Sequence, residues 1–206
     1  MSLYSNINYT FLDRYTIFGN IAMNGDSRFG KNYRYGVFPA ISGRWRVSGE
    51  PFMKDIKGEW LNDFSLRSSY GITGKSPDSD YLFFNRYSTY SYGYLGESTT
   101  YPSSLELKEL RWERSLQSNY GLNFVAFDYK LNLEFDYYIR LTKDQYSENT
   151  SIPTSSGFSS MALNYGTLRN NGWELNINYT PIKTKDLNVN IAFNMAREEN
   201  SVTQLS

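Results

Sequence analysis

The stretch that decides the fold is WELNINYTPIKTKDLNVNIAFNM, from Trp173 to Met195. Apolar side chains occupy nearly every second position on either side of PIKTKD, and asparagines fill most of the positions between them. Successive side chains of a strand point to opposite faces of the sheet, so this stretch predicts a β-hairpin with one apolar and one amide-rich face. Many soluble sheets share this pattern, so the rest of the chain has to decide which environment the hairpin occupies.

Six further segments alternate in the same way, which predicts eight strands in total. The further strands are expected at residues 3–11, 15–23, 37–47, 64–72, 113–127 and 131–141, and one short helix is expected within residues 49–63. Most of these strands have the roughly nine residues that a membrane-crossing strand needs. The pattern favours an all-β, antiparallel, up-and-down sheet that forms part of a transmembrane β-barrel.

The predicted connections differ in length between the two edges of the sheet. The short turns LDR, DYK and PIKTKD fall at one edge, and the three longest loops, near residues 24–36, 75–110 and 143–168, are expected at the other. Outer-membrane barrels have this asymmetry, with short periplasmic turns and long extracellular loops. Aromatic residues at many strand ends fit the girdles that form where a barrel wall meets the lipid–water boundary.

Charged side chains occur at positions that the alternation assigns to the inner face. Charges are costly in a dry core and are tolerated in a wet lumen. In a lumen they would form a polar path for a solute, hold a plug, or simply be hydrated and paired with one another. A soluble β-protein explains the alternation too, but explains these charges, the strand lengths and the one-sided loops less well. The candidate lumenal charges are Arg44, Arg46, Arg67, Glu134, Asp136 and Arg140.

The composition excludes several classes of site. The 206 residues include no cysteine and no histidine, so zinc–thiolate sites, Ser-His-Asp triads and Cys–His nucleophiles are excluded within the chain. The 21 basic and 21 acidic residues balance, which gives no electrostatic case for binding nucleic acid. No run approaches the roughly 18 apolar residues of a membrane helix. We therefore predict no catalytic residue, no cofactor and no metal site, and a protein that is not an enzyme.

The longest loop is rich in aromatic residues. Within DYLFFNRYSTYSYGYLGESTTY, the rings are interpreted as platforms for a sugar or peptide ligand, as a docking surface for a partner protein, or as extensions of strands above the membrane. Tyrosine suits partner docking because it offers a large contact area at low entropy cost. The candidate ligand or partner residues of this loop are Tyr81, Phe84, Tyr87, Tyr90, Tyr92, Tyr94 and Tyr101.

Several segments together resemble one family. They are NGDSRFGKNYRYGVFPAISGRWRVSGEPFM (24–53), WLNDFSLRSSYGITGK (60–75), LKELRWERSLQSNYGLNF (107–124), LNLEFDYYIRLTKDQY (131–146) and NYGTLRNNGWELNINYTPIKTKDLNVNIAFNMA (164–196). In order and spacing they are similar to the SusC/RagA family of TonB-linked outer-membrane proteins of Bacteroidota, along essentially the whole chain.

The resemblance implies a barrel of about 22 strands with an N-terminal plug. It also implies nutrient uptake of oligosaccharides or peptides, with a SusD-like surface lipoprotein and the TonB complex as partners and the lipid bilayer as surroundings. No secretory signal, TonB box or plug is recognisable in residues 1–206, so we expect the chain to be an internal part of the receptor's β-barrel domain, with about eight of its strands. No ligand-binding residue can be carried over from the family to this part.

Two other classes stay open from the residues alone. One is a non-transporting outer-membrane barrel, such as an adhesin or a component of a secretion channel. The other is a soluble extracellular carbohydrate-binding β-protein. The chain's dependence on detergent would separate the second class from the membrane barrels.

Overall fold

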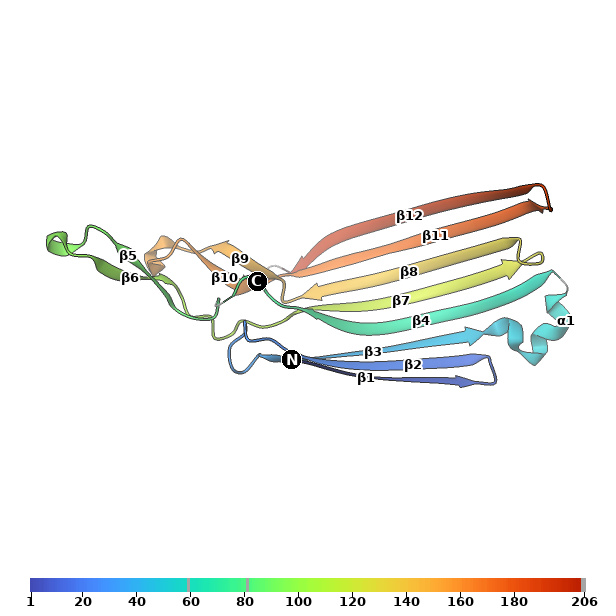
Figure 1. Cartoon of the computed structure of the whole chain (residues 1–206), viewed down its shortest axis with the longest axis horizontal. Helices are drawn as coiled ribbons and strands as arrows, with labels where there is room; N and C mark the ends of the chain where they lie inside the picture. Colours follow the sequence, from blue (N-terminus) through green and yellow to red (C-terminus); the bar gives the residue numbers. More distant parts are fainter. Residues whose placement is uncertain (59, 81, 205–206) are drawn as a thin grey trace.

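Eight antiparallel strands form one open sheet in the computed structural model, which describes residues 1–58, 60–80 and 82–204. Each strand pairs with its neighbours along the chain, so the topology is up-and-down (Figure 1). The eight strands are β1 (Ser2–Phe11), β2 (Tyr15–Gly25), β3 (Tyr35–Arg46), β4 (Leu61–Lys75), β7 (Glu113–Ala126), β8 (Leu131–Lys143), β11 (Thr167–Lys183) and β12 (Asn188–Gln204).

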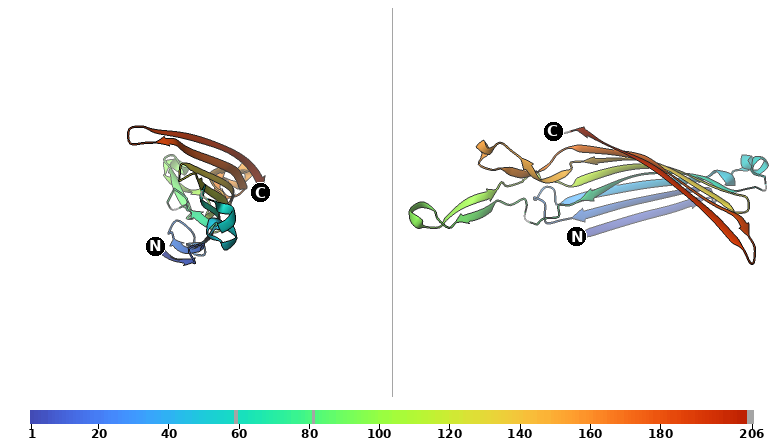
Figure 2. Two further views of the ribbon diagram at one scale, coloured as in Figure 1. Left: turned by 90° about the vertical axis from the view of Figure 1, so that its right-hand side faces the viewer. Right: turned by 90° about the horizontal axis from the view of Figure 1, so that it is seen from above.

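The register of the sheet aligns the alternating patterns of neighbouring strands. Ile41 pairs with Tyr70, and Tyr120 pairs with Tyr137, while Arg44 pairs with Arg67. Directly paired residues lie on the same side of an antiparallel sheet, so apolar residues gather on one face and polar residues on the other. We call these the apolar face and the polar face. The sheet is strongly curved and twisted (Figure 2), as right-handed strand twist requires.

The apolar face is not covered by any described part of the chain. Ile21, Ile41 and Phe193 each keep at least half of their surface exposed, although they lie near the middle of their strands. A monomeric soluble protein rarely exposes an apolar patch of more than a few hundred Å². The face therefore fits an apolar medium rather than water. Among the described residues, no helix is long and apolar enough to cross a membrane.

The connections at the two ends of the strands differ in length, as the sequence predicted. We call these two ends of the sheet the turn edge and the loop edge. The turn edge carries the tight turns at residues 12–14, 127–130 and 184–187, and the loop edge carries residues 26–34, 76–112 and 144–166 (Figure 1). One detail of the prediction is wrong. The connection at residues 47–60 lies at the turn edge, yet it is longer than the loop at 26–34, because it folds into η1 (Val47–Gly49), η2 (Pro51–Met53) and α1 (Lys54–Lys57).

The two longest loops contain strands that the alternation did not predict. β5 (Arg86–Tyr90) pairs with β6 (Thr99–Ser104), and β9 (Tyr146–Ser151) pairs with β10 (Ser160–Asn164). Between β5 and β6, η3 covers Tyr94–Gly96, and η4 (Thr154–Ser156) lies between β9 and β10. Both hairpins project beyond the loop edge (Figure 1), where neither face has to be apolar, so the sequence lacks the period of two that marks the wall strands.

Buried apolar side chains lie towards the two edges of the sheet rather than in its middle. At the loop edge, Phe29, Leu82 and Leu110 form a small cluster, which we call the loop core. Tyr33, Phe83, Leu107, Trp112 and Tyr146 pack against it. Since these residues come from all three long loops, the loop core fixes the loops to one another.

The outer strands of the sheet keep free edges within the described residues. β1 pairs only with β2, and β12 pairs only with β11. Unpaired edges of this length are ready to accept another strand. The sheet thus has the form of an open section of wall, with one apolar face and one polar face.

Candidate functional site

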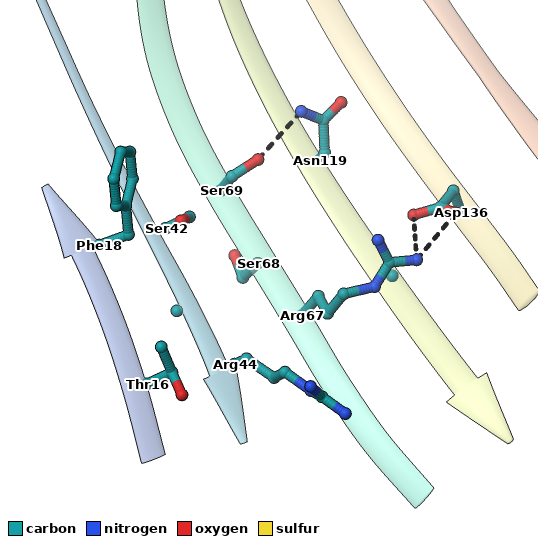
Figure 3. Close-up of a pocket in the computed structure, with 11 residues that line it drawn as sticks. Thr16, Phe18, Ser42, Arg44, Arg67, Ser68, Ser69, Asn119 and Asp136 are labelled. Carbon is teal, nitrogen blue, oxygen red and sulfur yellow. Dashed lines mark hydrogen bonds and ion pairs between the residues drawn. The ribbon is translucent and has the colours of Figure 1, made fainter. Parts of the chain in front are cut away.

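The polar face holds a depression of about 450 Å³ across the middle strands of the sheet (Figure 3). Thr16 comes from β2, Ser42 and Arg44 from β3, and Arg67 and Ser69 from β4. Hydroxyl, amide and charged groups from five successive strands line the depression, together with the ring of Phe18 (Figure 3). A surface with this lining is suited to polar contacts.

Two of the candidate charges meet in this depression. Arg67 on β4 and Asp136 on β8 are separated by β7, and both pair in register with Gly121. Nη2 of Arg67 lies 3.1 Å from each carboxylate oxygen of Asp136 (Figure 3). A Cβ atom on Gly121 would lie 2.5 Å from Oδ1 of Asp136, so a side chain at this position would push the pair apart. The glycine is what lets the guanidinium reach across the intervening strand.

A second group of charges lies nearer the turn edge. Nε of Arg46 lies 2.7 Å from Oδ1 of Asp63, and Nη2 of Arg44 lies 3.1 Å from Oδ2. The hydroxyl of Ser48 donates to the same carboxylate at 2.9 Å. Asp63 is therefore shared by two arginines that project from the end of β3, and the group keeps a net positive charge.

The remaining candidate charges take part in less direct contacts. Nε of Arg140 donates to Oε1 of Gln117, whose amide nitrogen donates to Asn119, and Asn119 in turn donates to Ser69 at 3.0 Å. This hydrogen-bonded chain runs across three strands of the polar face. Glu134 pairs in register with Asn123 and Asn176, and no ion pair of Glu134 is found among the described residues. All six candidate charges thus lie on the polar face.

Four polar atoms of this face lack a hydrogen-bond partner among the described residues although they are buried. They are Oγ of Ser65, Oδ1 of Asn123, Nε of Arg67 and Oδ1 of Asn170. Ser65 and Asn123 are register partners, and Ser65 is fully buried. Folded proteins leave few such atoms unpaired. These atoms mark places on the polar face where the packing of neighbouring side chains leaves hydrogen bonds unmade.

At the loop edge, aromatic rings connect the loop core to the polar face. Phe29 packs against Trp112 with ring centroids 4.6 Å apart, and Phe38 contacts the same indole edge-on at 5.4 Å. The indole nitrogen of Trp112 donates to the carbonyl of Tyr33 at 3.0 Å. Phe38 belongs to β3, so the loops are held against the wall itself.

The base of the β9–β10 hairpin is fixed by one aspartate and one asparagine. Asp144 pairs with Arg111 at 2.8 Å and with Arg114 at 2.7 Å. The side-chain amide of Asn164 donates to the carbonyls of Arg111 and Asp144 and accepts from the backbone N–H of Arg111. These contacts join the two long loops directly.

The β5–β6 hairpin presents most of the predicted aromatic loop. Tyr90 and Tyr101 stack with centroids 4.3 Å apart on one face of the hairpin, and Tyr87 lies on the other face. Tyr92, at the tip, is 93% exposed. Phe84 precedes β5 and packs against Phe83 at 4.0 Å. Tyr81 and the side chain of Tyr94 lie outside the described residues.

At the turn edge, Glu50 anchors the connection between β3 and β4. Its carboxylate accepts hydrogen bonds from the hydroxyl of Tyr15 and, at 3.0 Å, from the indole of Trp45, and it pairs with Arg14 at 3.0 Å. The Tyr15 hydrogen bond, followed by that of Trp45, holds the pKa of the Glu50 carboxyl below its ordinary value. The contact ties residues 47–53 to the first tight turn.

Sequence reasoning did not single out several residues that organise these regions. Gly121, Asp63 and Glu50 act through partners on other strands, and nothing in the local sequence marks those partners. A faint signal existed for Gly121, since it stands at an inward position where the alternation otherwise places a polar side chain. Among the described residues, no cluster of three acidic side chains could hold a metal ion.

Comparison with known proteins agrees with the wall-like architecture. The family profile described as "TonB dependent receptor-like, beta-barrel" matches residues 2–204. TonB-dependent receptor P39 of Formosa agariphila is 36% identical over the whole chain, and TonB-dependent receptor SusC of Bacteroides thetaiotaomicron is 33% identical. These matches cover 19% and 21% of the two relatives.

Solved structures give the same result in three dimensions. The RagAB peptide importer in its closed-closed state matches 99% of this chain with a TM-score of 0.88 and 30% identity, and in its open-open state with a TM-score of 0.89. The match covers 22% of that importer chain, so this chain spans about a fifth of the length of its relatives. Together with the eight-stranded antiparallel sheet, these findings show that the chain belongs to the TonB-dependent receptor-like β-barrel family, with SusC among its relatives.

Proposed function

We propose that this chain forms part of the wall and surface loops of an outer-membrane importer for oligosaccharides or peptides. The observation that carries the proposal is the division of the sheet into an exposed apolar face and a hydrogen-bonding polar face, with the two longest loops at one edge. Lipid outside and water inside impose this division on every strand of a barrel wall. The apolar face then contacts the outer-membrane lipid, and the loop edge faces outwards.

On the polar face, the side chains of Arg44, Arg67 and Asp136 each keep more than a third of their surface exposed, which favours contact with a further polar layer. In the importer this layer is the plug, which occupies the lumen. The Arg67–Asp136 pair and the Asp63 group then lie where the wall meets the plug or the solute path. Movement of the plug, driven through the TonB complex, would admit the captured ligand.

The β5–β6 hairpin is the proposed contact with a SusD-like surface lipoprotein. The exposed rings of Tyr87, Tyr90 and Tyr92 support this assignment, because exposed tyrosines on a rigid projection give large contact areas. The hairpin projects furthest from the sheet (Figure 1), where a lid protein would meet it first. Ligand would be captured between this lid and the loops.

The hairpin assignment is tested by replacing Tyr87, Tyr90 and Tyr92 with alanine in the full-length receptor. We expect weaker binding of the lipoprotein, measured by co-purification and by titration of the purified partner. Tyr129→Ala is the matched control, because Tyr129 is equally exposed but lies in a turn at the opposite edge. Unchanged partner and ligand binding by the triple variant would leave the hairpin with a structural role alone.

The transport proposal is tested by the same receptor in cells. Loss of the receptor should abolish uptake of a labelled oligosaccharide or peptide pool, and restoring it should restore uptake. Purified receptor should require detergent to stay monomeric. A receptor that is monomeric in buffer without detergent would favour the soluble β-protein, and an inserted receptor without uptake activity would favour a non-transporting barrel.

A further inference from the structure

The apolar face is bordered, on its side towards the loop edge, by basic residues on four neighbouring strands. On β7 the apolar positions end at Leu116 and the next residue on that face is Arg114. On β8, Leu141 is followed on the same face by Lys143. Arg114 and Lys143 are direct register partners. The first charged residue above the apolar surface is thus basic on both strands.

The next two strands continue the same pattern. On β12 the apolar positions end at Met195, and Arg197 follows on that face. On β11 they end at Trp173, followed by Asn171 and then Arg169. We call Arg114, Lys143, Arg169 and Arg197 the basic belt. Its four strands lie side by side in the sheet (Figure 1).

Position on the apolar face separates the basic belt from the candidate lumenal charges. Arg169 pairs in register with Leu141, and Arg197 pairs with Trp173, so both project on the side of the apolar surface. The boundary runs obliquely across the register rows, as it does when the strands of a wall are tilted against the membrane plane. The belt follows the boundary rather than a single row of residues.

Only half of the basic belt is neutralised within the described part of the chain. Arg114 pairs with Asp144, and Arg197 pairs with Glu199 at 2.6 Å. Lys143 and Arg169 form no ion pair among the described residues, and Arg169 is exposed. Like charges that face each other across a strand pair are unfavourable. Asp144 is shared between Arg111 and Arg114, so its single charge does not balance the opposed Arg114 and Lys143, and this place keeps a net positive charge.

We propose that the basic belt binds the phosphate groups of anionic lipids in the outer leaflet, at the loop edge of the wall. This inference rests on the proposed membrane location and adds a lipid-binding site to it. The occupant is argued from charge and position: the cations stand directly above an apolar surface, where acyl chains end and headgroups begin. Trp173, the last apolar residue of β11 on this face and the register partner of Arg197, supplies a ring that favours this depth.

The test uses the full-length receptor in detergent micelles, with bound lipids counted by native mass spectrometry. Phosphatidylglycerol and phosphatidylcholine with identical acyl chains are titrated as the anionic and zwitterionic probes. We expect the double variant Lys143→Gln with Arg169→Gln to bind phosphatidylglycerol roughly tenfold more weakly, since each basic residue at a membrane surface attracts anionic lipid. Binding of phosphatidylcholine should not change.

The control is the double variant Lys183→Gln with Lys185→Gln, which removes the same charge at the turn edge. It should keep the phosphatidylglycerol affinity of the original receptor. Equal weakening by both double variants would overturn the proposal, because the effect would then follow total charge. An unchanged affinity in the Lys143–Arg169 variant would overturn it as well, and so would inorganic phosphate that binds as tightly as the lipid.

Failure of the proposed membrane location gives a different result. In that case the original receptor binds neither lipid and needs no detergent, and substitutions in the basic belt change neither result. A receptor that requires detergent and binds both lipids equally would instead reject the belt and leave the membrane location intact.

Discussion

Arg67 and Asp136 pair across an intervening strand, with Nη2 of the arginine 3.1 Å from both carboxylate oxygens. Gly121 lies between them in register and leaves room for the contact. The relationship joins three wall strands on the polar face through side chains, in addition to the backbone ladder. Of the contacts in the candidate site, this ion pair depends most directly on the absence of a Cβ atom at position 121.

Gly121→Ala should break this ion pair. The new Cβ would lie 2.5 Å from Oδ1 of Asp136 and 3.0 Å from Nε of Arg67, so one or both side chains must move. Because both side chains are more than a third exposed, the expected cost is only about 1 kcal/mol. Urea unfolding of the receptor in micelles measures it. Gly43→Ala is the control, since its Cβ would meet nothing closer than 4.0 Å, and equal effects of the two substitutions would contradict this account.

Phe29→Ala should loosen the three long loops without opening the wall. Phe29 is fully buried, and removal of a buried phenylalanine ring costs about 3–5 kcal/mol. Hydrogen–deuterium exchange should rise in residues 26–34 and 107–112, while the central wall strands keep their protection. Phe52→Ala, at a ring that is 55% exposed in the turn-edge connection, should leave the loops unchanged. Increased exchange throughout the wall would show that the loop core supports the sheet rather than the loops alone.

Asp144→Asn should release the base of the β9–β10 hairpin by removing charge alone. Asparagine keeps the shape of the side chain and tolerates the left-handed backbone of this residue, whose φ is 55°. Without the negative charge at position 144, the ion pairs with Arg111 and Arg114 are lost. The hairpin base is then held less firmly, so faster proteolysis within residues 144–166 is expected. Asp128→Asn, at a turn residue that also has a φ of 55°, serves as the control. If both variants are digested at the same rate, the ion pairs of Asp144 do not anchor the hairpin.

Glu50→Gln should make the stability of the folded protein less dependent on pH in the acidic range. The pKa of Glu50 is lowered in the folded protein, so its contribution is fully present above the ordinary carboxyl pKa, about 4.3, and is lost as the pH falls through the folded value. Melting temperatures of the receptor in micelles, taken from pH 7 downwards, should therefore fall less in Glu50→Gln than in the original protein. Asp13→Asn, in the adjacent turn, should retain the original slope. Parallel curves for all three proteins would exclude a role for Glu50.

Some features of the chain could be predicted from the sequence because they depend on local periodicity. The hairpin at Trp173–Met195 and the other alternating segments correspond to the eight wall strands, and the short turns fix their order. Strand ends were less accurate. β11 begins at Thr167 and β12 continues to Gln204, because above the apolar boundary both faces are polar and the alternation disappears.

The sequence by itself determined the all-β wall, its two unlike faces and the family, because alternation and segment order are properties of the chain alone. Tertiary structure decided which of the polar residues meet: the Arg67–Asp136 pair across Gly121, the Asp63 and Glu50 groups, and the loop core around Phe29. These contacts join residues up to 83 positions apart, as between Phe29 and Trp112. Only the folded sheet and its packed loops bring such residues within reach, and the local alternation does not indicate which polar side chains or loops will meet.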